Sequence, residues 1–231
     1  MVALVGLLAW GTPFWGSAAE SPPKPAVFVV GGTRGTGLEV VKLLRARGEP
    51  VTALARPQSD TSVLEELDAR VVRGDAMNAG DVRAAMASGP HWAVISTLGG
   101  QRGDKNRPDF EGNRNVVDAA KAVGVNRFVL VSTVGAGESK KGAPALVRWF
   151  LRKPIELKEQ AEEYLVASGL NYTIVRPGRL IDKAPSRKAV LVEDPETFSA
   201  IARADLAALL VDALYDTTTE RGIYTAYDAS R

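Results

Sequence analysis

The chain has 231 residues, with 29 Lys or Arg against 27 Asp or Glu, and its net charge of +2 gives no strong field to attract nucleic acid or an anionic membrane. It has no cysteine and one histidine, His91, which excludes disulfides, thiolate chemistry and Cys/His metal sites. We therefore expect no nucleic-acid partner and no metal site, and we expect His91 to be a surface residue where a strand begins.

The first 25 residues differ in composition from the rest. They carry no charged side chain before Glu20 and end in small residues and a Pro-rich spacer. An apolar stretch followed by small residues resembles a secretory signal peptide cleaved after Ala19, although no Lys or Arg stands at its start. An organelle-targeting peptide, or a start codon placed too early in a cytoplasmic protein, are the alternatives. We expect residues 1–25 to lie outside the folded domain, which spans 26–231.

From Ala26 onward, short apolar runs alternate with amphipathic stretches. The runs predict strands at Ala26–Val30, Pro50–Ala55, Ala69–Val72, Trp92–Ser96, Arg127–Ser132, Tyr172–Arg176, Ala189–Val192 and Gly222–Tyr227. The intervening stretches predict helices at Gly35–Arg47, Thr61–Leu67, Ala79–Ala87, Phe110–Val123, Ala143–Ser168 and Ala202–Leu214. Because most strands are apolar throughout, they indicate a buried, mostly parallel sheet. The fold class predicted is α/β, a single doubly wound Rossmann-type domain.

Three glycines follow the first strand, in the segment GGTRGTG. Gly31, Gly35 and Gly37 stand between an apolar strand and an apolar helix face, where a backbone without Cβ atoms lets phosphates approach a helix N-terminus. The second strand is followed by Arg56 rather than by an acidic residue. An acidic residue there would bind a ribose 2′-hydroxyl, whereas Arg56, with Arg34 in the turn, suits a 2′-phosphate. The pattern therefore favours NADP(H) over NAD(H).

The glycine spacing resembles the short-chain dehydrogenase/reductase superfamily, and further segments agree with it: GDA at 74–76, STLGG at 96–100, EGNRNVVDAA at 111–120, RFVLVST at 127–133 and NYTIVRPGRLID at 171–182. The resemblance covers about residues 26–227. It implies that the cofactor is contacted by Gly31, Thr33, Arg34, Gly35, Thr36, Gly37, Arg56, Asp75, Ala76, Thr97, Leu98, Gly99, Asn115, Ser132, Thr133, Lys158, Pro177 and Gly178.

The catalytic Tyr-Lys pair of that superfamily is missing. Four residues before Lys158 stands Pro154, and the residue four after Tyr164 is Ser168. The segment LKEQAEEYLVASGLNYTIVRPG instead resembles the atypical branch, the NmrA-like and NAD(P)H-binding group that includes biliverdin reductase B. The candidate catalytic residues are Ser132, as a hydrogen-bond partner of a substrate carbonyl, and Lys158, as a contact to the ribose. A strand-end Ser bonded to local backbone and a solvated helix-face Lys are the alternatives.

The resemblance implies an NADPH-dependent reductase of a flavin, quinone or similar small conjugated acceptor. A non-catalytic NAD(P)-binding redox sensor or assembly factor, with a protein partner, is the alternative. One further segment is ambiguous: the basic stretch from Lys140 to Lys153, with Trp149 and Phe150, predicts an amphipathic helix with its apolar face on the core. A lid or a membrane-facing element are its other interpretations.

Overall fold

A central eight-stranded sheet organises the protein, with strand order β3-β2-β1-β4-β5-β6-β10-β8. The computed structural model describes residues 24–101 and 103–230. All neighbouring strands are parallel except β8, which runs antiparallel to β10. The strands are β1 (Ala26–Val30), β2 (Val51–Ala55), β3 (Arg70–Arg73), β4 (His91–Ser96), β5 (Arg127–Val131), β6 (Asn171–Pro177), β8 (Val190–Val192) and β10 (Gly222–Tyr227).

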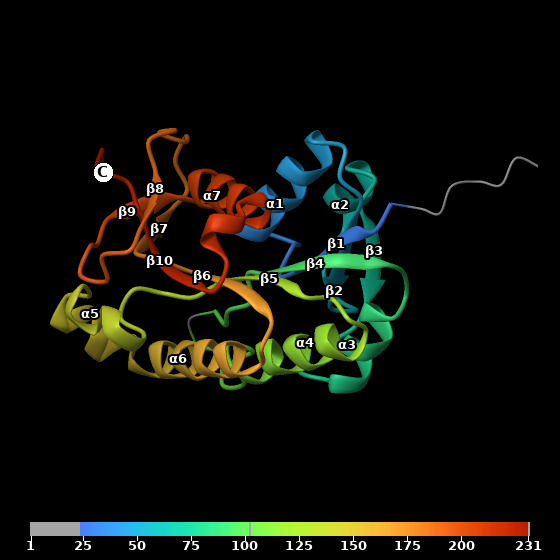
Figure 1. Cartoon of the computed structure of the whole chain (residues 1–231), viewed down its shortest axis with the longest axis horizontal. Helices are drawn as coiled ribbons and strands as arrows, with labels where there is room; N and C mark the ends of the chain where they lie inside the picture. The colour runs from blue at the N-terminus through green and yellow to red at the C-terminus, as the bar shows by residue number, and fades with distance from the viewer. Residues whose placement is uncertain (1–23, 102, 231) are drawn as a thin grey trace, which may run out of the picture.

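Helices cover both faces of this sheet, as Figure 1 shows with the sheet seen edge-on. The helices α1 and α7 lie on one face, and α3, α4 and α6 lie on the other. The helices are α1 (Gly35–Ala46), α2 (Ser62–Glu66), α3 (Ala79–Met86), α4 (Glu111–Ala122), α5 (Ala145–Phe150), α6 (Arg152–Ala167) and α7 (Arg203–Tyr215), with short 3-10 turns η1 (Gly137–Lys141) and η2 (Thr217–Thr219). The predicted α/β doubly wound fold with a mostly parallel sheet is confirmed.

The two faces have separate hydrophobic cores because successive strand residues point to opposite sides of the sheet. Val27 and Val29 of β1 pack with Val41 and Leu210 on the α1/α7 side. Phe28 and Val30, the residues between and after them, pack into the other core with α3, α4 and α6. Every residue of β2 and β5 is buried, which agrees with their mostly apolar sequences; the exceptions are Thr52 and Arg127.

The strand order reverses beside β1, since β2 lies on one side of it and β4 on the other. The connections from β1 and β4 therefore diverge to opposite faces, through α1 and α4 respectively. In open parallel sheets this divergence leaves a crevice beyond the carboxyl ends of the strands, where ligands bind. The functional site is expected at this point.

The structure differs from the sequence predictions in the region 143–168. The prediction of a single long helix there is wrong: α5 ends at Phe150, and α6 begins at Arg152, with Leu151 as the one residue between them. Pro154 accounts for the second start, because its ring is tolerated in a first helical turn but would clash with the preceding turn of a continuous helix. Two short parallel strands, β7 (Arg179–Ile181) and β9 (Ala200–Ala202), were also not predicted, and they form a separate small sheet.

Two further expectations are corrected. The apolar face of the segment from Lys140 to Lys153 does not rest on the core, because α5 has no buried residue. His91 begins β4 but is half-buried rather than on the surface: its Nδ1 lies 3.0 Å from the Met86 carbonyl oxygen and its ring packs edge-on against Phe28. The proposed cleavage after Ala19 lies outside the described residues. Between residues 24 and 230, with 102 left out, no helix is long and apolar enough to cross a membrane.

Candidate functional site

A cleft of about 1020 Å³ opens where the strand order reverses. Most of the residues that the sequence assigned to the cofactor line it: Gly31, Thr33, Arg34, Gly35, Thr36, Gly37, Arg56, Asp75, Ala76, Thr97, Leu98 and Gly99. The structure thus brings the ends of β1, β2, β3 and β4 to one cavity. The other six, Asn115, Ser132, Thr133, Lys158, Pro177 and Gly178, are not among the lining residues.

Two glycines of the turn, Gly31 and Gly37, leave no room for a side chain at their positions. Gly31 has φ +83°, and a Cβ there would be 2.6 Å from the Thr97 hydroxyl oxygen. A Cβ at Gly37 would be 2.1 Å from the Gly31 carbonyl oxygen, which is fixed backbone. These contacts press the start of α1 against the end of β1, so that both glycines are required by the packing itself.

The N-terminus of α1 faces the cleft with unsatisfied donors. Its N-cap residue, Arg34, makes no side-chain capping bond, and no acidic residue stands in the first turn. The Thr36 hydroxyl is buried and has no hydrogen-bond partner within the described residues. Free backbone N–H groups, the positive end of the helix dipole and an orphaned hydroxyl together fit a phosphate group.

Two arginines lie at the rim of the same cleft. The Arg56 side chain is exposed and makes no hydrogen bond or ion pair with any described residue. The Arg34 guanidinium faces Gln101, which follows β4; with the Gln101 amide oxygen turned toward it, both terminal nitrogens donate at 2.7 Å. Ser59 lines the cleft on the Arg56 side. This basic rim fits a second anionic group beyond the one at α1.

The loop after β3 is fixed by an amide from α4. Asn115 is buried, and its Nδ2 donates to the Ala76 carbonyl oxygen at 2.9 Å. The Asp75 carboxylate accepts from the Met77 backbone N–H at 3.0 Å, while its own N–H donates to Asp81 at 2.9 Å. Asn115 therefore shapes the wall of the cleft without lining it.

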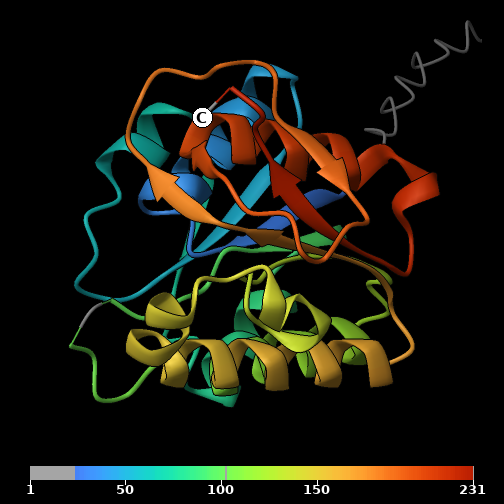
Figure 2. The same cartoon turned by 90° about the vertical axis from the view of Figure 1, so that its left-hand side faces the viewer.

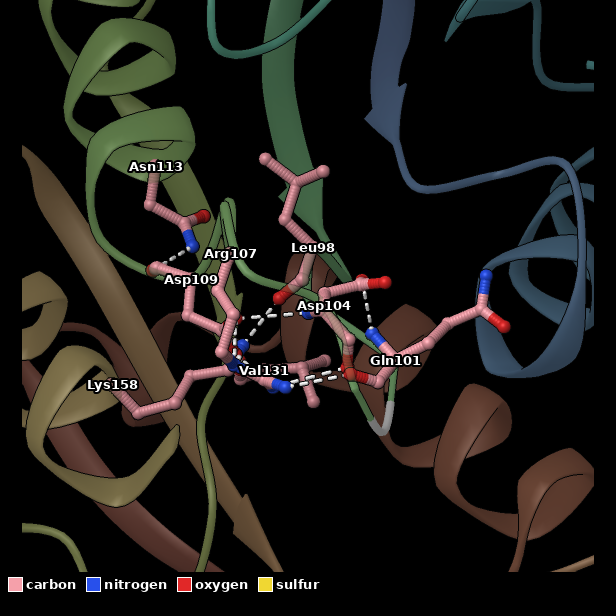
Figure 3. Close-up of polar contacts among 9 residues, drawn as sticks. Leu98, Gln101, Asp104, Arg107, Asp109, Asn113, Val131 and Lys158 are labelled. Atoms are coloured by element: carbon pink, nitrogen blue, oxygen red, sulfur yellow. Dashed lines mark hydrogen bonds and ion pairs between the residues drawn. The ribbon is translucent and has the colours of Figure 1, made fainter. Parts of the chain in front are cut away.

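The segment after β4 is held by a polar network drawn in Figure 3. Asp109, which is buried, accepts from the Gly100 backbone N–H at 2.9 Å and pairs with Arg107 at 3.1 Å. Arg107 also donates to the Gly100 carbonyl oxygen at 3.0 Å. Asn113 ties this network to the strand, since it donates to the Asp109 carbonyl oxygen at 2.6 Å and accepts from Ser96 at 2.6 Å.

Lys158 reaches from α6 into this region (Figure 3). Its Nζ donates to the Val131 carbonyl oxygen at 2.7 Å and to the Leu98 carbonyl oxygen, joining the ends of β5 and β4. The alternative that Lys158 is solvated is wrong, because the residue is 7% exposed. Burial lowers the pKa of Lys158 to about 8, although Asp109 and Glu162 oppose this shift. An ammonium group engaged in this way is a structural tie between two strand ends.

Ser132 follows β5 directly, and its hydroxyl has no hydrogen-bond partner although the residue is only 4% exposed. The alternative that this side chain bonds local backbone is therefore wrong. The segments after β5 and at the end of β6 stay paired, since Val134 N donates to the Pro177 carbonyl oxygen at 2.9 Å. Gly178 lies against the next segment, where a Cβ would be 2.2 Å from the Ser199 carbonyl oxygen. The Thr133 hydroxyl donates to the Val134 carbonyl oxygen at 3.2 Å.

The structure supplies no tyrosine next to Lys158. Tyr164 lies further along α6, where its hydroxyl donates to Asp118 of α4 at 2.7 Å and its ring packs edge-on against Phe110. The hydrogen bond to Asp118 raises the pKa of Tyr164, which makes it a poorer acid. Among the described residues, no group of three or more His, Cys, Asp or Glu side chains has the arrangement to hold a metal ion.

Several lining residues were not predicted from the sequence. They come from the loop after β4 and from the region of β7 and α7: Gln101, Asp104, Lys105, Asn106, Pro108, Leu180, Asp182 and Arg203. Arg203 pairs with Asp182 at 2.7 Å and lies over Gly35, where its side chain would be 3.6 Å from a Cβ. The Asp182–Arg203 pair had no sequence signal, since 20 residues, which include the short strands β8 and β9, separate its members. The Gly-rich run at 99–100 was the one local sign that the loop after β4 approaches a ligand.

The sequence model of the NAD(P)H-binding family matches residues 31–217. The chain belongs to this family. The resemblance to the atypical short-chain reductases is thereby confirmed at the level of the family, and the matched region contains the glycine turn, both rim arginines and Lys158. A dinucleotide-binding role thus accords with the cleft that the fold builds at the carboxyl ends of β1 to β4.

Among solved structures, the protein is similar to the anaerobilin reductase ChuY from Escherichia coli O157:H7, with a TM-score of 0.81 and 29% identity, over 89% of this chain and 98% of that one. A short-chain dehydrogenase/reductase from Veillonella parvula, solved in complex with NADP, shares the fold with a TM-score of 0.72 and 18% identity, over 89% of this chain and 95% of that one.

Among related sequences, an uncharacterised chloroplast protein of Arabidopsis thaliana is 35% identical to this chain, over 86% of this chain and 75% of its own length. The divinyl chlorophyllide a 8-vinyl-reductase of rice, also chloroplastic, is 30% identical over 89% of this chain. The match spans 58% of that enzyme's length, so the chain corresponds to little more than half of it. Two of these relatives, ChuY and the rice enzyme, are named as reductases, which supports an oxidoreductase activity in the family.

Proposed function

We propose that the protein is an NADPH-dependent reductase that transfers hydride to a small conjugated acceptor such as a tetrapyrrole, flavin or quinone. The observation that carries the proposal is the cleft beside β1, with a bare glycine turn, an uncapped α1 and two rim arginines. Three relatives support the acceptor class, because they are named as reductases of compounds that contain conjugated rings: ChuY, the vinyl-reductase and sanguinarine reductase of Eschscholzia californica.

The residues of the cleft divide into two groups in this proposal. Gly31–Gly37 and the Thr36 hydroxyl receive the pyrophosphate, since they offer backbone N–H groups and an unpaired donor at a helix N-terminus. Arg34 and Arg56 hold the 2′-phosphate, because both lie at the rim and neither is paired with a carboxylate in the described chain. NADP(H) is therefore the preferred dinucleotide.

Hydride transfer in this site proceeds without a tyrosine acid. When bound, the reduced nicotinamide supplies a hydride to an electron-poor carbon of the acceptor. Lys158 orients the strand ends that carry Leu98 and Val131, two residues that line the cleft. The Ser132 hydroxyl is buried just outside the residues that line the cleft and has no protein partner, and in this proposal it donates to an oxygen of the bound acceptor. Water delivers the proton that completes the reduction, since delocalisation of charge over a conjugated ring lowers the need for a strong acid.

The test is NADPH oxidation by the purified protein with a panel of biliverdin-type tetrapyrroles, flavins and quinones. We expect acceptor-dependent oxidation with at least one of them at about 1 per second or faster, an ordinary enzyme rate. Gly37→Ala serves as the negative control because it fills the glycine turn. NADPH that binds but is not oxidised above the buffer rate with any acceptor would contradict the proposal.

The second candidate is a non-catalytic NAD(P)-binding sensor or assembly factor, favoured by one observation. The position of the missing tyrosine is taken by Pro154, and Lys158 is committed to two carbonyl oxygens. This candidate predicts that NADPH changes the affinity for a protein partner while turnover stays absent. A pull-down with and without NADPH, set beside the oxidation assay, separates the two functions.

We also infer that the segment 1–25 targets the protein to a plastid-type organelle. The support is that three relatives, from Arabidopsis thaliana and rice, are chloroplast proteins. A secretory destination is less compatible with NADPH, which is maintained inside cells. N-terminal sequencing of the native protein tests this inference: a mature chain that still begins at Met1 would contradict it.

A further inference from the structure

The helix α5 exposes a cluster of large apolar side chains that no part of the described chain covers. Leu146, Trp149, Phe150 and Leu151 are 68%, 72%, 65% and 45% exposed. Leu146, Trp149 and Phe150 are spaced at i, i+3 and i+4, so they share one face of the helix. The Trp149 and Phe150 rings lie edge to face, with their centroids 4.6 Å apart. We call these four residues the α5 apolar cluster.

The cluster is held in this exposed position by its surroundings. Ala143, just before α5, is buried near Gly135 and Ile155. The Arg148 guanidinium donates to the Lys140 carbonyl oxygen at 2.9 Å, which fixes α5 against the preceding turn. Figure 1 shows α5 at one end of the molecule's long axis, beyond the end of α6, and in Figure 2 this end faces the viewer. The apolar side chains thus stand on a projecting element.

Cations border the α5 apolar cluster. Residues 138–153 contain five basic side chains and a single acidic one, Glu138. Three of the five are paired with carboxylates of neighbouring segments: Lys140 with Glu159, Lys141 with Glu196 and Arg152 with Glu156. Arg148 and Lys153 have no carboxylate partner within the described residues, and both adjoin the apolar side chains in the sequence.

From this arrangement we propose that α5 docks the protein reversibly onto a lipid bilayer surface containing anionic headgroups. Trp, Phe and Leu on a projecting turn match the interfacial zone of a bilayer, where an aromatic ring meets both acyl chains and water. Arg148 and Lys153 then lie at headgroup height, where their long side chains reach anionic lipids. A protein interface of ordinary size needs about 20 to 30 residues on each side, many more than this short helix presents.

Membrane docking does not depend on the proposed reaction, but it is compatible with it. Apolar ring acceptors, such as quinones, partition into bilayers, so an enzyme held at the surface would meet acceptors of this kind at higher local concentration. The cofactor cleft is lined by residues from other parts of the chain than α5, so docking leaves it unobstructed by the cluster itself. The protein needs no spanning helix for this mode of attachment.

The experiment compares full-length wild type with Trp149→Ser/Phe150→Ser in sedimentation with vesicles of phosphatidylcholine alone or mixed with phosphatidylglycerol. The matched control is Val123→Ser/Val190→Ser, two substitutions at valines that are 45% and 48% exposed elsewhere on the surface. All three chains keep the same N-terminal segment, so the difference between them reports α5. We expect the partition coefficient of the aromatic double variant onto vesicles to fall about tenfold or more, and that of the control variant to equal the wild-type value.

A second double variant tests how much the basic side chains contribute to vesicle binding. Arg148→Gln/Lys153→Gln is expected to reduce partition onto phosphatidylglycerol vesicles about tenfold while leaving that onto neutral vesicles unchanged. Equal partition of wild type and the aromatic double variant overturns the proposal, whatever its absolute level. A change of oligomeric state in that variant, measured by analytical ultracentrifugation without any change in vesicle partition, also overturns it and makes the cluster a contact between copies of the chain.

Discussion

Lys158 donates a hydrogen bond to the carbonyl oxygen of Val131 at 2.7 Å, from a position on α6 that is almost fully buried. The same ammonium donates to Leu98, so one side chain connects β5 with the segment after β4. Both acceptor residues line the cleft. The lysine that the superfamily pairs with a tyrosine is therefore, in this chain, a tie that sets the spacing of two cleft walls.

This burial makes the stability of the protein depend on pH. Burial lowers the pKa of Lys158 to about 8 in the folded protein, from the 10.5 of an ordinary lysine. Between these values the unfolded chain binds more protons than the folded one, so the free energy of unfolding rises with pH there. Below about pH 8 both states are protonated and the full burial penalty applies.

We predict that wild type gains stability relative to Lys158→Met as pH rises through this window, by an amount on the order of 3 kcal/mol. Urea unfolding of both proteins at about pH 7 and about pH 10 measures it. Taking the difference removes the contribution of other titrating groups, such as Tyr215, whose pKa burial raises to about 12. Parallel stability curves for the two proteins would show that Lys158 does not change its charge there.

Gly37→Ala should disrupt the glycine turn. The added Cβ would be 2.1 Å from the Gly31 carbonyl oxygen, and the backbone on both sides is fixed by β1 and α1. We expect a loss of about 1–3 kcal/mol in the free energy of unfolding and at least tenfold weaker NADPH binding, measured by nicotinamide fluorescence. Gly48→Ala is the control: Gly48 has a φ of +72°, so the substitution strains the backbone, but a Cβ there has no neighbour within 4 Å and Gly48 lies outside the cleft. It should lose stability only, and a loss of NADPH binding in both variants would argue against a local steric cause.

Arg56→Glu tests the 2′-phosphate assignment. Removal of one charge-assisted contact and introduction of a repulsive carboxylate should weaken NADPH binding about 10- to 100-fold, with NADH binding little changed. Arg83→Glu on α3, also an exposed arginine, is the charge-matched control and should leave both affinities unchanged. Equal NADPH affinity in wild type and Arg56→Glu would remove Arg56 from the proposed site.

The sequence predicted those parts of the fold that depend on local pattern. The strand β1 matches its predicted bounds because an apolar run followed by glycines and a helical repeat is a local signal. The partners of Lys158 were not predictable, since Val131 and Leu98 stand 27 and 60 residues away and contact it only through the fold. The exposure of α5 was missed for the same reason: an amphipathic pattern indicates an apolar face but not what covers it.

The last prediction uses two serines at neighbouring strand ends. The Ser132 hydroxyl is buried without a partner, whereas the Ser96 hydroxyl donates to Asn113 at 2.6 Å. Ser132→Ala removes a polar group that already lacks a bond, so its free energy of unfolding should change by less than about 0.5 kcal/mol or increase. Ser96→Ala breaks a buried bond and should cost about 1–3 kcal/mol.

Turnover should respond in the opposite order. If the Ser132 hydroxyl donates to the acceptor, Ser132→Ala lowers kcat about 10- to 100-fold while NADPH affinity and stability stay near wild type. Ser96→Ala, of the same chemistry but directed into the Asn113 network, should lose stability with a smaller effect on kcat at temperatures where it remains folded. The two variants together separate a role in the reaction from a role in packing. Unchanged kcat in Ser132→Ala would contradict the proposed role of Ser132. It would show that hydride transfer needs no side-chain donor from the end of β5 and that Ser132 is only a packing residue.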